Sequence, residues 1–276
     1  MFFADTECVL CGKFIEANIL LTFIIMKIFV INLPEDTDRL KAIENQLQTL
    51  GLSYDVFTAI RGSSLSSAEI SESYDEKWFV RNEGRAAALG ELGCAMSHIA
   101  IYRIILERKI PHALVLEDDA WLNPNLPQLL EYIAKKFKAD QKNVFLLTWY
   151  KAISRSGIER IWSSYHLAPI ESAYCTHGYV LSYAAAAAMC KELAPVRHVA
   201  DCWIWLRRHR VVNIRAIFPT CITADLSYKS GVSLEIKQNP LRHSFYIMRM
   251  HKIYRAFWLA YDHTFAFLKR IRFLIN

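Results

Sequence analysis

The chain has 276 residues, of which 53% are hydrophobic and 22% are charged. Such a chain can bury a substantial core, which excludes a mainly disordered protein and suits one large α/β domain or one domain with a small appendage. The formal net charge is +6, but the excess lies in residues 242–276, where seven Lys/Arg stand against one acid. A balanced body with a basic tail favours an anionic membrane surface over nucleic acid as a partner.

The cysteines and the N-terminal residues favour a location in the cytoplasm. The seven cysteines are odd in number and irregularly spaced, so we expect a reducing, cytoplasmic environment. Residues 19–33 are apolar but too short for a span and interrupted by Lys27, and no basic segment precedes them, so they predict neither a membrane span nor a secretory signal. We expect residues 1–26 to lie outside the core and the folded domain to cover residues 27–240.

A β-α-β unit opens the predicted domain. The apolar residues 27–33 read as a buried strand, apolar residues from Leu40 to Leu50 recur at helical spacing, and residues 54–59 read as the next strand. This order favours a parallel sheet. Residues 61–67 form a predicted loop at the carboxyl end of a strand, where open α/β sheets bind ligands.

The same alternation continues along the chain. Residues 93–109 predict a helix, and His112–Asp119 predict a central strand because their apolar residues are continuous. The further expected elements are a helix at 126–137, a strand at 143–149, a strand at 178–182, a helix at 183–193 and a strand at 211–218. The predicted fold class is therefore α/β with a mostly parallel central sheet.

Three adjacent carboxylates, Glu117, Asp118 and Asp119, end the predicted central strand. Negative charges placed so close together are costly unless a cation compensates them. Because alternate side chains of a strand share a face, Glu117 and Asp119 could enter one pocket while Asp118 points away. Mn²⁺ or Mg²⁺ bound there would suit a diphosphate leaving group. The alternative is an acidic turn that caps the following segment.

Four blocks of sequence, taken in order, resemble glycosyltransferase family 25. They are IFVINLPEDTDRL (28–40), LGELGCAMSH (89–98), ALVLEDDA (113–120), and THGYVLSYAAA (176–186) followed by Asp201. The resemblance covers roughly residues 27 to 230 and implies a GT-A-type fold that binds a UDP-sugar and a metal, with inversion at the anomeric carbon. Neither a GxGxxG nor a P-loop motif occurs, which argues against dinucleotide or P-loop chemistry.

The resemblance implies roles for residues of the opening blocks and the acidic triplet. Asp119 is the first candidate for the metal ligand, with Glu117 as the second and Glu117 or Asp118 facing the ribose or donor sugar. Asn32 and Arg39 match the opening turn, and Arg39 could contact the base or phosphate or be a surface helix arginine. Arg61 is a further donor-site candidate, at a position where family members usually carry an acid.

Glu91 and His98 lie in the second block. Glu91 is expected in a glycine-flanked turn just before a helix, where it could cap free amides, reach a sugar hydroxyl or serve as the catalytic base. His98 is a donor-site candidate, but its helical neighbours are apolar, so a packed histidine is the favoured alternative.

Asp201 is the first candidate for the catalytic base. An inverting displacement needs a group that removes the proton of the acceptor hydroxyl, and Asp201 matches the family's late acid. The following aromatic residues Trp203 and Trp205 could form a stacking platform for a sugar. The alternative role of Asp201 is to cap the helix that begins there.

The basic tail, residues 241–276, mixes basic and aromatic residues, which is typical of a helical appendage on an anionic membrane surface; a packed final helix is the alternative. We therefore expect a cytoplasmic enzyme, peripheral at the inner face of the membrane, that moves a hexose from a UDP-sugar to a lipid-linked glycan. The preferred reaction is galactose transfer to lipooligosaccharide. The competing hypotheses are glucose transfer, a sugar-nucleotide nucleotidyltransferase, and an inactive glycan-binding protein.

Overall fold

The computed structural model describes residues 26–225. Apart from the buried Met26, the predicted N-terminal extension and the basic tail at 241–276 lie outside the described residues. The described residues form two compact units. The first contains residues 26–59, 97–192 and 200–225, and the second contains residues 60–96 and 193–199.

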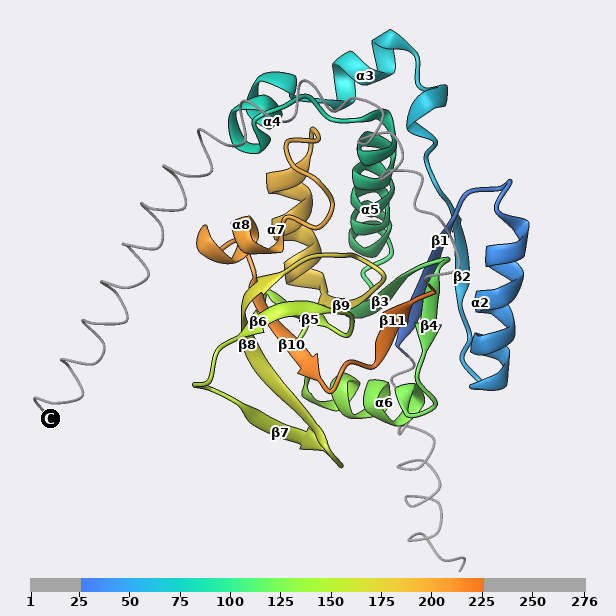
Figure 1. Cartoon of the computed structure of the whole chain (residues 1–276), viewed down its shortest axis with the longest axis vertical. Coiled ribbons are helices and arrows are strands. Elements are labelled where there is room, and N and C mark those ends of the chain that lie inside the picture. The colour runs from blue at the N-terminus through green and yellow to red at the C-terminus, as the bar shows by residue number, and fades with distance from the viewer. Residues whose placement is uncertain (1–25, 226–276) are drawn as a thin grey trace, which may run out of the picture. The chain divides into compact units, whose positions relative to one another are not determined.

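A nine-stranded sheet organises the first unit, within the described residues (Figure 1). Its order is β2-β1-β3-β9-β5-β10-β8-β6, and β7 pairs with β8. The strands are β1 Lys27–Asn32, β2 Asp55–Thr58, β3 His112–Glu117, β5 Asn143–Leu146, β6 Tyr150–Ile153, β7 Glu159–Trp162, β8 Tyr165–Ala173, β9 Gly178–Ser182 and β10 Asn213–Phe218. Two short strands, β4 Ala120–Leu122 and β11 Ile222–Ala224, pair separately.

The sheet is mixed, so the expectation of a mostly parallel sheet holds only in part. β1 is parallel to β2 and β3, and β10 is parallel to β5. β9 is antiparallel to both β3 and β5, and the pairs of β8 with β6, β7 and β10 are also antiparallel. Parallel pairs need long crossovers, whereas β6, β7 and β8 follow one another through short connections and therefore pair antiparallel.

Helices cover both faces of this sheet, and α6 and α7 lie on opposite sides of it (Figure 1). The helices with residues in the first unit are α2 Thr37–Thr49, α5 Leu89–Glu107, α6 Leu126–Lys136, α7 Tyr183–Leu193 and α8 Trp203–Arg208. One buried cluster joins Leu114 and Leu116 of β3 to apolar side chains of α2 and α6. On the opposite face, the hydroxyl of Tyr179 on β9 lies 2.9 Å from that of Tyr102 on α5.

The second unit contains the short helices α3 Ser67–Ser73 and α4 Glu76–Glu83 and the first turns of α5. A 3₁₀ turn at Gly62–Ser64 replaces the start of the predicted loop at 61–67. Gly62 packs so closely against Leu89 that a Cβ atom at position 62 would overlap its carbonyl oxygen. A side chain is therefore excluded at this position.

Several predicted elements match closely, and others were missed. β9 and α7 have the expected bounds, whereas α5 begins at Leu89, one turn before the expected residue 93. The segments that form α3, α4 and β6 to β8 carried no prediction. α5 is long and apolar enough to cross a membrane by length and composition, but 56% of the relevant window is buried within the protein, as in a core helix.

Candidate active site

The acidic triplet divides between the two faces of the sheet at the end of β3. Glu117 is the last residue of the strand and lies on the face of α5, as do Ala113 and Val115. Asp118 turns to the face of α2, where it meets Asn32 and Arg39. Asp119 returns to the side of Glu117, and the ligand atoms of both carboxylates lie within 4.8 Å of a ring nitrogen of His177. The geometry expected from strand alternation is therefore observed.

Two residues just before β9 complete this cluster, and our sequence reasoning missed both. The hydroxyl of Thr176 donates to Glu117 Oε1. His177 Nε2 lies 3.9 Å from Glu117 Oε2 and 3.7 Å from Asp119 Oδ1. The signal was present, because Thr176 and His177 open the fourth family block, but nothing in local spacing connects them with residue 117.

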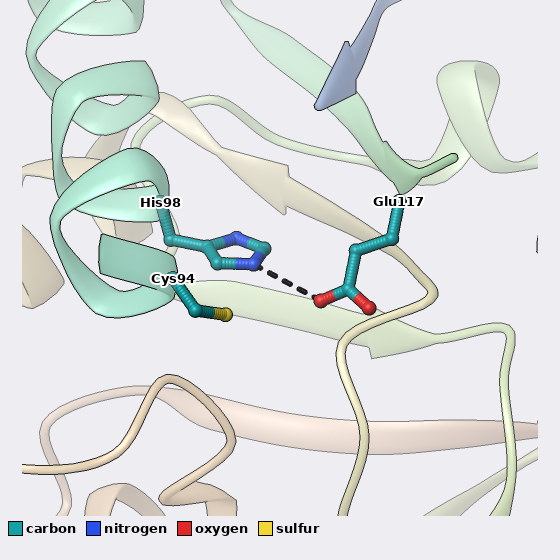
Figure 2. A group of neighbouring side chains, drawn as sticks. All are labelled: Cys94, His98 and Glu117. Carbon is teal, nitrogen blue, oxygen red and sulfur yellow. Dashed lines mark hydrogen bonds and ion pairs between the residues drawn. The ribbon is translucent and has the colours of Figure 1, made fainter. Parts of the chain in front are cut away.

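His98 supports Glu117 from α5. Its ring points at the carboxylate, with Nε2 3.3 Å from Oε1, and Cys94 lies one turn earlier on the same helix (Figure 2). His98 Nδ1 lies 2.7 Å from the Tyr179 hydroxyl, which contacts Tyr102. In a consistent assignment, Tyr102 donates to Tyr179, Tyr179 donates to Nδ1, and Nε2–H donates to Glu117. His98 is thus both the packed histidine we favoured and a partner of the acidic cluster.

The pKa values of the two carboxylates on this face are shifted in opposite directions. Burial alone would raise the pKa of Glu117, but the hydrogen bond from His98, together with His177 and the hydrogen bond from Thr176, outweighs it and lowers the pKa to about 2. Burial and the negative charge of Glu117 raise the pKa of Asp119 to about 6. Asp119 Oδ1 is also buried and has no hydrogen-bond partner among the described residues. An ionised Asp119 is therefore under-compensated, which is the environment expected of a cation ligand.

Asp118 is satisfied by protein contacts on the other face. Its Oδ2 accepts a hydrogen bond of 2.8 Å from Asn32 Nδ2, and its Oδ1 lies 3.3 Å from Arg39 Nη1. Burial raises the pKa of Asp118, while Asn32 and Arg39 oppose that rise. The three candidates Asn32, Arg39 and Asp118 thus form one partly buried group that ties β1 and α2 to the end of β3.

Asp201 contacts the loop before β9. Its Oδ2 accepts a hydrogen bond of 2.9 Å from the backbone N–H of Cys175. The predicted helix cap is wrong, because Cys202 rather than Asp201 occupies the N-cap position of α8. The predicted sugar platform is also wrong for Trp203, which is fully buried and donates from Nε1 to the Cys175 carbonyl at 2.9 Å. An aromatic pattern cannot separate an apolar core residue from an exposed stacking surface.

Glu91 and Arg61 belong to the second unit. Glu91 lies inside the first turn of α5, so the predicted turn before the helix is wrong. Its carboxylate pairs with the guanidinium of Arg85 through both oxygens and accepts the Ala88 N–H at 2.9 Å. These contacts fit the capping role. Arg61 is an exposed residue at the start of the 3₁₀ turn. The catalytic and binding roles of both residues stay predictions.

The segment after the acidic triplet is fastened by β11. Ala120 on β4 pairs with Ala224, and the Asp225 N–H donates to the Asp119 carbonyl at 2.8 Å. Ile222 of β11 packs against Gly178, where a Cβ atom would approach its side chain to 2.5 Å. Pairing of β4 with β11 thus holds the backbone of Asp119 in place.

Residues 25–204 match the family described as "Glycosyltransferase family 25 (LPS biosynthesis protein)". The match covers more than half of the chain, and the chain belongs to glycosyltransferase family 25.

Similar proteins include a procollagen galactosyltransferase 1 from Danio rerio, 25% identical over 209 residues that span 70% of this chain and 33% of the relative. Another is named "Probable inactive glycosyltransferase 25 family member 3" in Bos taurus, 26% identical over 58% of this chain and 28% of the relative. The chain thus spans about a third or less of the length of these curated relatives.

A solved structure from Bacillus anthracis, described as a glucose-1-phosphate thymidylyltransferase in complex with a sucrose, covers 80% of this chain and 96% of that chain, with 12% identity and a TM-score of 0.38. This similarity is too low to support an argument about the site or the fold.

Proposed function

We propose that this chain transfers a hexose from a nucleotide sugar to a glycan, with a divalent cation held by Glu117, Asp119 and His177. The observation that carries the proposal is the convergence of these three side chains, with Asp119 Oδ1 buried and without a hydrogen-bond partner within residues 26–225. Family membership supports the transferase activity and a nucleotide-sugar donor.

The donor set fits the proposed cation. Two carboxylates are the ligands that Mn²⁺ and Mg²⁺ prefer, and an imidazole nitrogen is tolerated better by Mn²⁺, as a transition metal, than by Mg²⁺. The side chains of Glu117, Asp119 and His177 are 23%, 19% and 14% exposed, so a substrate phosphate can reach the same ion from solvent. When bound, the ion supplies charge neutralisation for the departing diphosphate.

The protein's own residues keep this site ready. Thr176 and His98 hold Glu117 in its ionised form, and His177 supplies the third ligand beside Asp119. Asp118, Asn32 and Arg39 fix the strand end from the other face. A site held in place before the donor arrives avoids reorganisation during the reaction.

The finer proposals concern the substrates and the location. Galactose from UDP-galactose is the preferred donor, in keeping with a relative named as a procollagen galactosyltransferase. A lipooligosaccharide acceptor, inversion at the anomeric carbon and action at the cytoplasmic face of a membrane complete the proposal. The tail that would contact that membrane, residues 241–276, lies outside the described residues.

Thermal stabilisation by UDP and Mn²⁺ tests the proposal. A ligand that binds only the folded state raises the unfolding midpoint, so we expect UDP and Mn²⁺ together to stabilise the protein more than the sum of their separate effects. Asp119→Ala should remove this joint effect. Asp140 is an exposed acid in the loop after α6. Asp140→Ala is therefore the matched control and should keep the joint stabilisation by UDP and Mn²⁺.

Donor hydrolysis then separates the remaining alternatives. UDP-galactose, UDP-glucose and other nucleotide sugars are each incubated with the protein and Mn²⁺, and release of UDP is measured. Faster turnover of UDP-glucose would replace the galactose proposal with glucose transfer. No turnover of any donor, together with no joint effect of UDP and Mn²⁺, would favour an inactive glycan-binding protein and overturn the proposal.

A further inference from the structure

Cys175 has both backbone polar groups held by one short segment. Its N–H donates to Asp201 Oδ2 at 2.9 Å, and its carbonyl accepts the Trp203 Nε1–H at 2.9 Å. Cys175 adopts a positive φ of 74°, a conformation that non-glycine residues rarely occupy. Such a conformation persists only where surrounding contacts fix it. Asp201 and Trp203 provide these contacts.

The two residues after Cys175 reach the acidic cluster. Thr176 bonds to Glu117, and His177 lies within ion-pair distance of Glu117 and Asp119. Because residue 175 sets the direction of the chain at this point, a change in its backbone conformation would redirect both side chains. The clamp formed by Asp201 and Trp203 on Cys175 therefore determines where His177 points.

Trp203 also supports Glu117 along a second route. Its ring is fully buried and meets the ring of Tyr179 edge-on, with centroids 5.1 Å apart. The Tyr179 hydroxyl in turn contacts His98, the hydrogen-bond partner of Glu117. Residues 201–203 thus support the cluster of Glu117, Asp119 and His177 in two ways, through the loop before β9 and through Tyr179 on β9.

We propose that Asp201 and Trp203 are positioning residues, which clamp the Cys175 backbone so that His177 is presented to the cation together with Glu117 and Asp119. This inference rests on the proposed cation site. It replaces the role of catalytic base for Asp201, because the structure shows its Oδ2 engaged with a backbone amide of the loop that carries His177. A positioning role requires a hydrogen-bond acceptor at residue 201, whereas a base requires a carboxylate.

Asp201→Asn and Asp201→Ala separate the two roles. The asparagine carbonyl can still accept the Cys175 N–H but cannot act as a base. We expect Asp201→Ala to weaken binding of Mn²⁺ alone by roughly 10- to 100-fold, the range observed when a residue that orients a metal ligand is removed. Asp201→Asn should stay within about threefold of the unchanged protein and keep most of the UDP-release activity.

A measurement without metal checks the clamp directly. Hydrogen exchange of the peptide containing Cys175 should accelerate at least about tenfold in Asp201→Ala and change little in Asp201→Asn, because an amide without its acceptor exchanges with solvent. Trp203→Phe keeps an aromatic ring but removes the Nε1–H donor to the Cys175 carbonyl together with part of the buried indole volume. It serves as the second variant if Asp201→Ala does not fold, and we expect weaker Mn²⁺ binding there as well.

The outcomes distinguish this inference from the proposed function. If the unchanged protein does not bind Mn²⁺, the cation site itself fails, and this inference fails with it. If the unchanged protein binds Mn²⁺ and Asp201→Ala binds it equally well, the clamp is overturned while the cation site stands. Equal loss of activity in both Asp201 variants, with Mn²⁺ affinity unchanged, would restore the catalytic base.

Discussion

Asp118 and Asp119 are neighbours with the same side chain, yet they lie in opposite environments. Asp118 faces α2 and has Asn32 and Arg39 as partners. Asp119 faces the other side, and one of its oxygens is buried and accepts no hydrogen bond from the part of the chain that the structure describes. The difference arises because the chain continues to alternate at the end of β3. An acidic run in sequence is therefore not a single functional unit, and the two carboxylates on the face of α5 are the ones expected to recruit a cation.

The largest expected effect compares the same substitution at both positions. Asp119→Asn should lower UDP release by at least about 100-fold, because it removes a charged group that compensates the metal at the reacting centre. Asp118→Asn should lower it by less than about tenfold. Steady-state turnover with Mn²⁺ and the preferred donor measures both. Equal losses would remove the distinction between the two faces.

His177 is expected to follow next in size. His177→Ala removes the nitrogen ligand but leaves both carboxylates, so the Mn²⁺ affinity should fall roughly 10- to 100-fold. His166 lies in β8 and stacks on Phe218 of β10, away from the acidic cluster. His166→Ala is therefore the matched control and should bind Mn²⁺ normally. Titration of the metal-free protein with Mn²⁺ gives both dissociation constants, and unchanged affinity in His177→Ala would exclude this residue from the site.

The raised pKa of Asp119 predicts how metal binding depends on pH. A proton on this carboxylate competes with the cation, so Mn²⁺ affinity should decrease as the pH falls through the metal-free pKa of about 6. The decrease should reach at least about tenfold per pH unit, because the imidazole of His177 must also be free of its proton to bind the metal. Glu117 stays ionised throughout this range, because its pKa is lowered to about 2. Constant affinity down to pH 4 would contradict the assignment.

The smallest expected effect concerns the support of Glu117. Tyr179→Phe removes the hydroxyl between Tyr102 and His98, which leaves the buried His98 Nδ1 without a donor, and should lower the free energy of unfolding by about 1–3 kcal/mol. Tyr102→Phe leaves Tyr179 able to donate and should cost only about 0.5–1.5 kcal/mol. Denaturant unfolding compares them, and the reverse order would contradict the assigned direction of the hydrogen bonds.

Periodicity predicted the parts of the fold where local and tertiary preferences agree. The β-α-β opening, β9 and α7 follow from continuous apolar runs and helical spacing, and the divergence of Glu117 and Asp119 from Asp118 follows from strand alternation. The hairpins of β6 to β8 were missed. β8 contains Pro169 and carries register irregularities with β6, so it lacks the regular alternation of a strand signal.

Contacts between distant loops could not be read from the sequence. His177 reaches Glu117 and Asp119 across about 60 residues of chain, and Asp201 reaches Cys175 across 26. No local period relates such positions. The burial of Trp203 could not be predicted either. An aromatic residue at the start of a helix can pack in the core, as Trp203 does against Tyr179, or be exposed to stack on a sugar.

Gly178 links the two halves of the site by steric exclusion. It follows His177 directly, and Ile222 occupies the volume that any larger residue at 178 would need. Ile222 pairs with Leu122 on β4, only three residues beyond Asp119. A methyl group added at residue 178 would push on Ile222, and through it on the strand pair that holds Asp119, and would also displace the neighbouring His177. The distance between the oxygen ligand Asp119 and the nitrogen ligand His177 therefore depends on glycine at residue 178.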